Sequence, residues 1–198
     1  MLSVSMCLYQ FKNGSQCQLE GQGKGFCFWH DPTIDKAGKK LTEELEALAN
    51  AGHCMEGFYL ARADLEGVNL VCHGRKEGFS LARADLYRAN LKGAHLFHID
   101  LEEASLMKAD CREANFHFAN LKRVNLLGAK FEGAKIENIE WGAQLLHEEK
   151  GREARKLKRH QEANDFFEQA EEIFRSLRKV SELQGLFELA GYFFYEEM

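Results

Sequence analysis

The central part of the chain repeats with a period of five residues. Stepping by five from Leu81, every position up to Trp141 is apolar, and every position two places earlier is also apolar and usually small. The same frame appears upstream at Leu60, Leu65 and Leu70. Neither the 3.6-residue period of a helix nor the two-residue period of a strand fits so long a run. The backbone must therefore turn a corner in each repeat and point one large and one small side chain inward.

One irregularity interrupts the period. The step from Leu70 to Leu81 is eleven residues, which is one more than two repeats would take. We expect the segment 71–78, with its two glycines, to absorb the additional residue as a bulge or a loop.

The repeats resemble the A(D/N)LXX signature of the pentapeptide-repeat family, as in the segments ARADL, YRANL, EEASL and FHFANL. This resemblance covers about 16 repeats between residues 58 and 141. It implies a mainly β fold, namely a right-handed quadrilateral β-helix in which four repeats make one square coil. About four coils would then stack along one axis, and residues twenty apart would lie above one another on the same face.

Two groups of outward residues in this expected stack are apolar or aromatic, whereas other positions alternate in charge, as in Arg83, Glu103 and Arg123. An exposed apolar patch of this kind typically marks a contact site. The alternative is that the C-terminal helices of the same chain cover both groups, and the sequence leaves the two open. The predicted interaction residues are Tyr87, Met107 and Leu127 in one column, and Phe97, His98, His117 and Phe118 in the other group.

Four metal-ligating side chains lie near the start of the chain. Cys7, Cys17, Cys27 and His30 have the spacing C-x9-C-x9-C-x2-H. Three thiolates and one imidazole complete the tetrahedral shell of Zn²⁺, and a closed shell of this kind is structural. The surrounding glycines and turn residues cannot build a core alone, so a metal would supply the missing folding energy. We therefore predict a structural zinc module over residues 1–40, the alternative being incidental free thiols beside a surface histidine.

The remaining reactive side chains form no recognisable catalytic motif. Cys111 occupies a core position of the repeat, and Cys54 and Cys72 lie outside any familiar ligand spacing. There is no Gly-rich phosphate loop after a strand, no nucleophile elbow and no HExxH motif. We therefore expect a protein that is not an enzyme. The start of the chain has no secretory signal pattern, so we expect reduced thiols and a cytoplasmic location.

Helical spacing replaces the five-residue period after Trp141. Apolar residues at three- and four-residue steps predict an amphipathic helix over about 161–184, between an earlier helix over about 143–157 and another after Gly185. The last two helices resemble a tetratricopeptide-like hairpin. One such unit cannot bury both of its faces, so it should dock on the coil, on a second copy or on another protein. The predicted parts are thus the module 1–40, a linker helix within 41–57, the repeats 58–141 and the helices 142–198.

These features favour a non-catalytic interaction scaffold or adaptor that binds another protein, with a homodimer through the C-terminal helices as a further expectation. The main alternative comes from the family resemblance, because some pentapeptide-repeat proteins mimic B-DNA and thereby protect topoisomerases. The expected stack of coils is about 20 Å long, and a DNA duplex of that length carries roughly 12 negative charges. Residues 58–141 hold 12 basic and 12 acidic residues, so this block is a poor electrostatic copy of DNA.

A third hypothesis is nucleic-acid binding by the N-terminal module, in which basic residues accompany Phe28 and Trp29. We favour the simpler interpretation, in which these aromatic rings pack inward around a metal. No run of the sequence approaches the roughly 18 apolar residues of a membrane-spanning helix, so we predict no membrane segment. The basic residues concerned are Lys12, Lys24, Lys36, Lys39 and Lys40.

Overall fold

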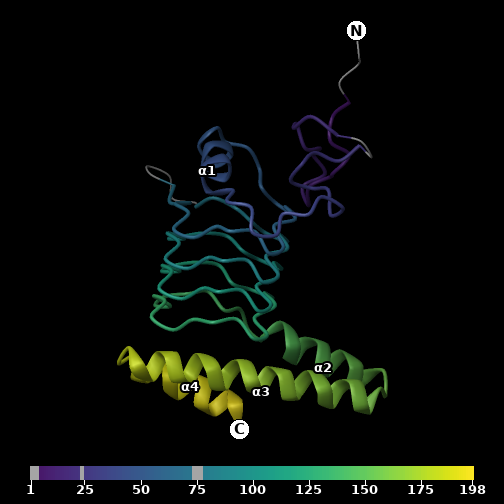
Figure 1. Ribbon diagram of the computed structural model, residues 1–198. Coiled ribbons are helices and arrows are strands. Elements are labelled where there is room, and N and C mark those ends of the chain that lie inside the picture. Colours follow the sequence, from purple (N-terminus) through teal and green to yellow (C-terminus); the bar gives the residue numbers. More distant parts are fainter. Residues whose placement is uncertain (1–4, 23–24, 73–77) are drawn as a thin grey trace.

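The computed structural model describes residues 5–22, 25–72 and 78–198 of the chain. An N-terminal module and a short helix lie at the upper end of a stack of coils, and three helices run across its lower end (Figure 1). The four helices of the described residues are α1 (Thr42–Asn50), α2 (Leu146–Lys156), α3 (His160–Leu183) and α4 (Phe187–Glu197).

From Ser80 onward, the coils stack through parallel backbone bridges between residues that are twenty apart. Ser80 pairs with Asp100, Asp100 with Asn120, and Asn120 with Glu140, and the other three sides of the coil follow the same rule. Backbone hydrogen bonds alternate upward and downward between layers, as where Leu86 N donates to Ser105 O at 2.8 Å. The expected twenty-residue register is therefore confirmed, and the repeats form a solenoid.

The expectation of a mainly β fold is confirmed in part, because the described repeats form a solenoid stacked through parallel bridges but contain no extended strands. Each bridge there involves an isolated residue, and no continuous strand or sheet is present among them. The physical reason is the short side of the coil, because five residues leave room for one bridged residue before the next corner. The described residues are thus turns joined by single bridges, with helices at both ends.

The insertion between Leu70 and Leu81 is longer than the one residue that their eleven-residue step suggests. Asn69 pairs with His95 in the layer below, a separation of 26 residues, whereas Ser80 pairs with Asp100 at a separation of 20. Leu70 and Leu81 are therefore consecutive core positions with six residues inserted between them, and the prediction of one additional residue is wrong. Most of the predicted bulge, residues 73–77, lies outside the described residues.

The polar residue of each repeat forms the corner that follows it. Asp85 Oδ1 accepts a hydrogen bond from Tyr87 N at 2.9 Å, and Asn120, Asn125 and Asp100 bond the backbone two residues on in the same way. Aspartate and asparagine are suited to this role because their short side chains mimic a backbone turn. This explains why Asp or Asn precedes the large apolar residue in so many repeats.

Each corner also contains a residue with a left-handed backbone, which is uncommon for residues other than glycine. Arg88, His98 and Phe118 have φ between 54° and 59°. Their N–H groups donate to the next layer, as in Arg88 N to Met107 O at 3.0 Å, and these bonds offset part of the backbone strain. The stacked neighbours therefore hold these residues in place.

The interior of the solenoid is filled by the large and small apolar residues of the repeat. Phe116 and Phe131 are almost completely buried, and their rings meet edge to face with centroids 5.6 Å apart. Ala89, Ala94 and Ala114 are completely buried at the small positions. The predicted inward pairing of one large and one small side chain is thus confirmed.

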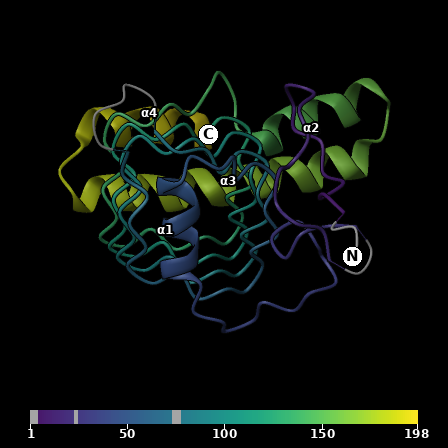
Figure 2. The same ribbon diagram turned by 90° about the horizontal axis from the view of Figure 1, so that it is seen from above.

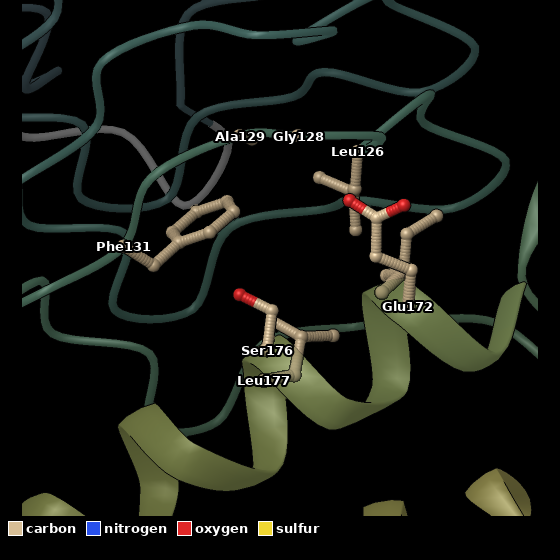
Figure 3. A pocket seen from close by; sticks show the side chains of 8 residues that line it. Leu126, Gly128, Ala129, Phe131, Glu172, Ser176 and Leu177 are labelled. Atoms are coloured by element: carbon tan, nitrogen blue, oxygen red, sulfur yellow. The ribbon is translucent and has the colours of Figure 1, made fainter. Parts of the chain in front are cut away.

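Helices cover both ends of this core. Seen along the axis in Figure 2, α1 lies over the upper coils, where its Leu45 is completely buried. At the lower end, α3 faces the last coil across a cavity of about 80 Å³ that Phe131 and Leu177 line (Figure 3). Gln184 Nε2 also donates to Ala134 O at 2.6 Å. The C-terminal helices therefore pack against the end of the stack.

Among the residues described, no helix combines the length and the apolar character needed to cross a lipid bilayer.

Helix α2 buries a histidine that should make stability depend on pH. His147 is 3% exposed, and its Nδ1 atom has no hydrogen-bond partner among the residues that the structure describes. Burial and, to a lesser extent, the nearby Lys150 lower the pKa of His147 to about 4. An unfolded chain protonates histidine near pH 6.5. The unfolded state therefore binds more protons between about pH 6.5 and pH 4, so the free energy of unfolding falls as pH falls through this range.

We expect this loss to reach about 2 to 3 kcal/mol at pH 4 and to vanish above pH 7. Replacing His147→Leu should remove that part of the pH dependence, because the new side chain takes up no proton in either state. The measurement is urea unfolding at several pH values, with the variant His160→Leu at an exposed position as the control. Equal slopes in the wild type and in His147→Leu would contradict the assignment.

Candidate metal centre and side faces

The N-terminal module is a set of tight antiparallel turns that bring its ligands together. Cys7 N donates to Leu19 O and Cys17 N to Tyr9 O, both at 2.9 Å. These bonds place the first two cysteines on neighbouring segments. His30 N donates to Cys27 O at 3.1 Å, and this turn puts the last two ligands of the set on one side of the chain.

The four predicted ligands converge on one point. The sulfur atoms of the three cysteines and one ring nitrogen of His30 all lie within 4.8 Å of one another. His30 Nδ1 lies 3.3 Å from Cys27 Sγ and 3.5 Å from Cys7 Sγ. We call these four residues the thiol cluster. A tetrahedral ion with bonds of about 2.3 Å to sulfur and about 2.0 Å to nitrogen needs donor atoms spaced in this way.

The hydrogen bond made by His30 Nε2 determines the protonation state of His30 Nδ1. His30 Nε2 lies 2.9 Å from Glu56 O, and a carbonyl oxygen can only accept a hydrogen bond. Nε2 must therefore carry the proton, which leaves the lone pair of Nδ1 facing the sulfur atoms. Metal-binding histidines commonly donate their second N–H to a carbonyl in this manner. The residues present thus fit a metal ion.

The thiol cluster is closed to solvent. Its side chains are at most 5% exposed, and the Tyr9 ring stacks on the His30 ring with centroids 3.9 Å apart. Burial raises the pKa of Cys17 to about 12 and also raises the pKa of Cys27. Burial lowers the pKa of His30, which favours the neutral imidazole that a metal requires. A site without an open position suits a structural ion rather than a catalytic one.

The cluster is joined to the solenoid through Glu56, a residue that belongs to none of the sequence motifs. Its carboxylate accepts hydrogen bonds from Lys12 N at 2.8 Å and from Arg83 Nη1 at 3.1 Å, while its carbonyl holds His30. Gly57 comes next, and a Cβ atom there would lie 1.9 Å from the Tyr9 hydroxyl. The spacing of the motif gives no sign that the backbone carbonyl of Glu56 would hold His30. The glycine at position 57 does indicate that another group lies close to the backbone there.

The other cysteines take no part in the cluster. Cys54 is exposed, and Cys111 is completely buried in the solenoid core, where burial raises the pKa of its thiol. Both placements agree with the sequence-based interpretation of these residues.

The residues proposed for nucleic-acid contact are partly inaccessible. Lys36 is 1% exposed, its Nζ donates to Asp31 O at 3.2 Å, and it lies 4.9 Å from the centre of the Phe28 ring. Trp29 is 8% exposed and stacks on Phe58. These two side chains are used inside the module, and Lys24 lies outside the described residues.

The three residues of the first predicted contact surface form a vertical column, here called the apolar column. Tyr87, Met107 and Leu127 are each half-buried, and bonds between layers join them, as in Lys108 N to Leu127 O at 2.9 Å. They lie on a side of the solenoid, whereas the C-terminal helices cross its lower end (Figure 1). Their role in binding stays a prediction.

The second predicted surface is a compact group of rings, here called the aromatic cluster: Phe97, His98, His117 and Phe118. The Phe118 ring stacks on both imidazoles, with centroids 5.1 Å from His98 and 4.8 Å from His117. His117 Nε2 also lies 3.0 Å from Asn138 Nδ2 and 3.4 Å from Glu137 Oε2. Phe118 is nevertheless 45% exposed, so the cluster presents an aromatic surface to solvent.

The model of the family "Pentapeptide repeats" matches residues 84–117 and 99–138, with eight copies of the repeat. The repeat block belongs to the pentapeptide-repeat family. No match was found among curated proteins.

Several solved pentapeptide-repeat proteins resemble parts of this one. HetL from Nostoc sp. strain PCC 7120, involved in heterocyst differentiation regulation, is 29% identical over 43% of this chain and 37% of its own, with a TM-score of 0.39. A protein from the thylakoid lumen of Arabidopsis thaliana is 27% identical over 42% of this chain and 57% of its own, with a TM-score of 0.32. The plasmid-mediated fluoroquinolone resistance protein QnrB1 is 20% identical over 43% of this chain and 57% of its own, with a TM-score of 0.16. The chain therefore spans about 37% to 57% of the length of these proteins.

Proposed function

We propose that this pentapeptide-repeat protein is a non-catalytic scaffold that binds other proteins through the side faces of a right-handed quadrilateral β-helix. In this proposal a structural zinc ion in the thiol cluster holds the N-terminal module together. The module and α1 close the upper end of the solenoid, while α2, α3 and α4 lie across the lower end. The sides of the solenoid are then the surfaces left for partners.

The observation that carries the proposal is the lateral position of the apolar column and the aromatic cluster. Soluble proteins rarely leave large contiguous apolar patches without a function. The layers beneath both surfaces are tied by regular backbone bonds, so their side chains are already held in place before a partner arrives. A preorganised surface lowers the entropy cost of binding. This suits an adaptor more than it suits a flexible linker.

Zinc is proposed over other metals because of the donor set. Three sulfur atoms and one imidazole nitrogen suit a borderline-soft ion with tetrahedral geometry, whereas magnesium and calcium prefer oxygen donors. The closed shell supports a role in folding. The position of Glu56 between His30 and Arg83 supports a second role, which is to fix the module on the first coil.

DNA mimicry has weaker support than the scaffold. The repeat block is neutral, with 12 basic and 12 acidic residues. One of its sides carries Arg62, Arg88 and Lys108 in successive layers. A surface that imitates the DNA backbone would need acidic residues at such positions. No specific feature of the described residues favours mimicry.

Capture from a cell extract of the source organism tests the scaffold. We expect the wild-type chain to retain at least one protein that the variant Phe97→Ser with Phe118→Ser retains at least about tenfold less, because central aromatic contacts dominate binding energy. The control is Glu132→Ser with Lys135→Ser, which changes exposed residues on the neighbouring side. Circular dichroism would verify that all three chains are folded. Identical sets of retained proteins for all three would contradict binding through the aromatic cluster.

A further inference from the structure

The side of the solenoid that holds the apolar column also carries a vertical row of basic residues. The backbone bridges Lys40–Asp64, Asp64–Asn90, Asn90–Asp110 and Asp110–Lys130 define five successive layers on this side. At about 4.8 Å per layer the row is about 19 Å long. All its basic side chains are exposed, and none has an ion-pair partner among the described residues. Arg62, Arg88 and Lys108 lie at the corner positions of three successive layers, and Lys40 and Lys130 lie at the bridge positions of the two end layers. Together these five residues are called the basic column.

A neighbouring side shows how the same corner positions are usually neutralised. There Glu103 lies between Arg83 and Arg123, with ion pairs of 3.9 Å and 3.7 Å. On the basic column the equivalent positions hold Arg62, Arg88 and Lys108, so like charges follow one another.

The aspartates at the bridge positions of this side have partners of their own. Asp64 accepts a hydrogen bond from Asn90, and Asp110 binds Arg112. Lys130 also acts on Asp110, because the pKa of that carboxyl is lowered by Arg112 and, more weakly, by Lys130. Stacked like charges are destabilising, and Arg62, Arg88 and Lys108 have no ion-pair partner among the described residues to offset this.

The apolar and basic columns lie directly beside each other. In two layers the apolar residue precedes a basic corner residue by one position, as in Tyr87 and Arg88 and in Met107 and Lys108, whereas Leu127 precedes Gly128. The Arg88 guanidinium lies over the Tyr87 ring, 5.2 Å from its centre. The complementary surface must therefore offer a line of apolar groups with a line of acidic groups next to it.

Helix α4 of the same chain has this composition. Residues 187–198 contain three glutamates and no basic residue. Glu188 is exposed, and neither Glu188 nor Glu196 has an ion-pair partner among the described residues. Phe187, Tyr195 and Met198 are 75%, 73% and 85% exposed. At 100° per residue these three side chains project from one side of the helix, and both glutamates follow beyond the same edge of that side, Glu188 directly and Glu196 further round.

The dimensions of α4 also fit the columns. Its 11 residues span about 16 Å, against about 19 Å for the basic column. Its pitch of about 5.4 Å is close to the layer spacing of about 4.8 Å, so each turn can meet one layer. An extended strand repeats on one face about every 6.8 Å and fits less well.

Gly191 lies between the exposed aromatic residues of α4. A Cβ atom there would meet nothing within 4 Å, so no contact within the chain requires a glycine at this position. Glycine inside a helix costs about 1 kcal/mol relative to alanine. A glycine on the exposed side allows the helix backbone to approach another surface closely.

We propose that α4 of a second copy of this chain docks along the apolar and basic columns, with Glu188 and Glu196 facing the basic residues. The proposal rests on the proposed function, because it assigns one of the two scaffold surfaces to self-association. The aromatic cluster then remains for a different protein. Each copy has one α4 and one pair of columns, so reciprocal docking gives a closed dimer.

Sedimentation velocity of the full chain at several concentrations tests this dimer. We expect the wild type to be dimeric and the charge reversal Arg88→Glu with Lys108→Glu to raise the dimer dissociation constant at least about 100-fold, because like charges then face each other. The reversal Glu188→Lys with Glu196→Lys should do the same. The control Lys135→Glu with Lys156→Glu, at exposed positions elsewhere, should leave the constant unchanged.

Mixing the two reversed chains provides the decisive measurement. Opposite charges then face each other again at both contacts, so the mixture should form a heterodimer with close to wild-type affinity. Failure of the mixture to associate, a wild type that is monomeric at about 100 µM, or a dimer that survives both reversals would overturn the proposal. A monomeric wild type that still captures a protein through Phe97 and Phe118 would overturn the self-association alone and leave the scaffold intact.

Discussion

Replacing Cys17→Ser should abolish stoichiometric zinc binding by the N-terminal module. We expect about one zinc per wild-type chain and less than about 0.1 in the variant, because a structural site with three protein ligands and no stabilising fourth loses most of its affinity. Structural zinc contributes about 10 to 16 kcal/mol of apparent binding free energy in small modules. The module should therefore unfold in the variant while the solenoid stays folded.

Two measurements check this prediction. Elemental analysis of protein purified without chelator gives the metal content, and limited trypsin digestion at Lys12 reports whether the module is folded. The matched control is Cys54→Ser, which removes an exposed thiol outside the thiol cluster. Wild-type protein without zinc, or a Cys17→Ser chain that retains it, would show that the four ligands do not form the site.

The variant Phe116→Ala should destabilise the solenoid by about 3 to 5 kcal/mol. Phe116 is completely buried and packs against Phe131, so the substitution removes a large side chain from the interior and leaves a cavity. The backbone around it cannot collapse to fill the space, because bonds to the layers above and below fix it, such as Phe116 N to Lys135 O at 2.9 Å. Urea unfolding followed by far-ultraviolet circular dichroism measures the change.

Phe118→Ala is the matched control, since it removes the same side chain two residues away. Phe118 is 45% exposed, so its loss should cost less than about 1 kcal/mol. Similar destabilisation by the two variants would mean that the inward and outward positions of the repeat have been assigned wrongly.

The sequence was sufficient for features that depend on local spacing. The five-residue period gave the inward positions, the twenty-residue register followed from the family resemblance, and the Cys-x2-His pair at Cys27 and His30 led to the complete thiol cluster. Each of these depends on residues close in sequence or on a regular repeat. The helices after Trp141 were predicted within a few residues for the same reason.

Features that depend on contacts between distant segments could not be predicted from the spacing of residues in the sequence. Nothing near Glu56 indicates that its carbonyl would hold His30, because every residue has a carbonyl. The interval between Leu70 and Leu81 fits one repeat with six residues inserted or two repeats with one inserted, and only pairing across layers separates these. The docking of α3 on the open end of the core also needs the finished coil, since the surface it covers exists only there.

The twenty-residue register restricts how a chain of this kind can change in length. Removing one five-residue repeat would rotate everything below it by a quarter turn, so α3 would meet a different edge of the coil. Removing twenty residues would shorten the stack by one coil and leave the orientation of the N-terminal module relative to α3 unchanged. Insertions and deletions within the solenoid are therefore tolerated in multiples of twenty residues, whereas the six residues inserted between Leu70 and Leu81 leave the register of the coils below unchanged.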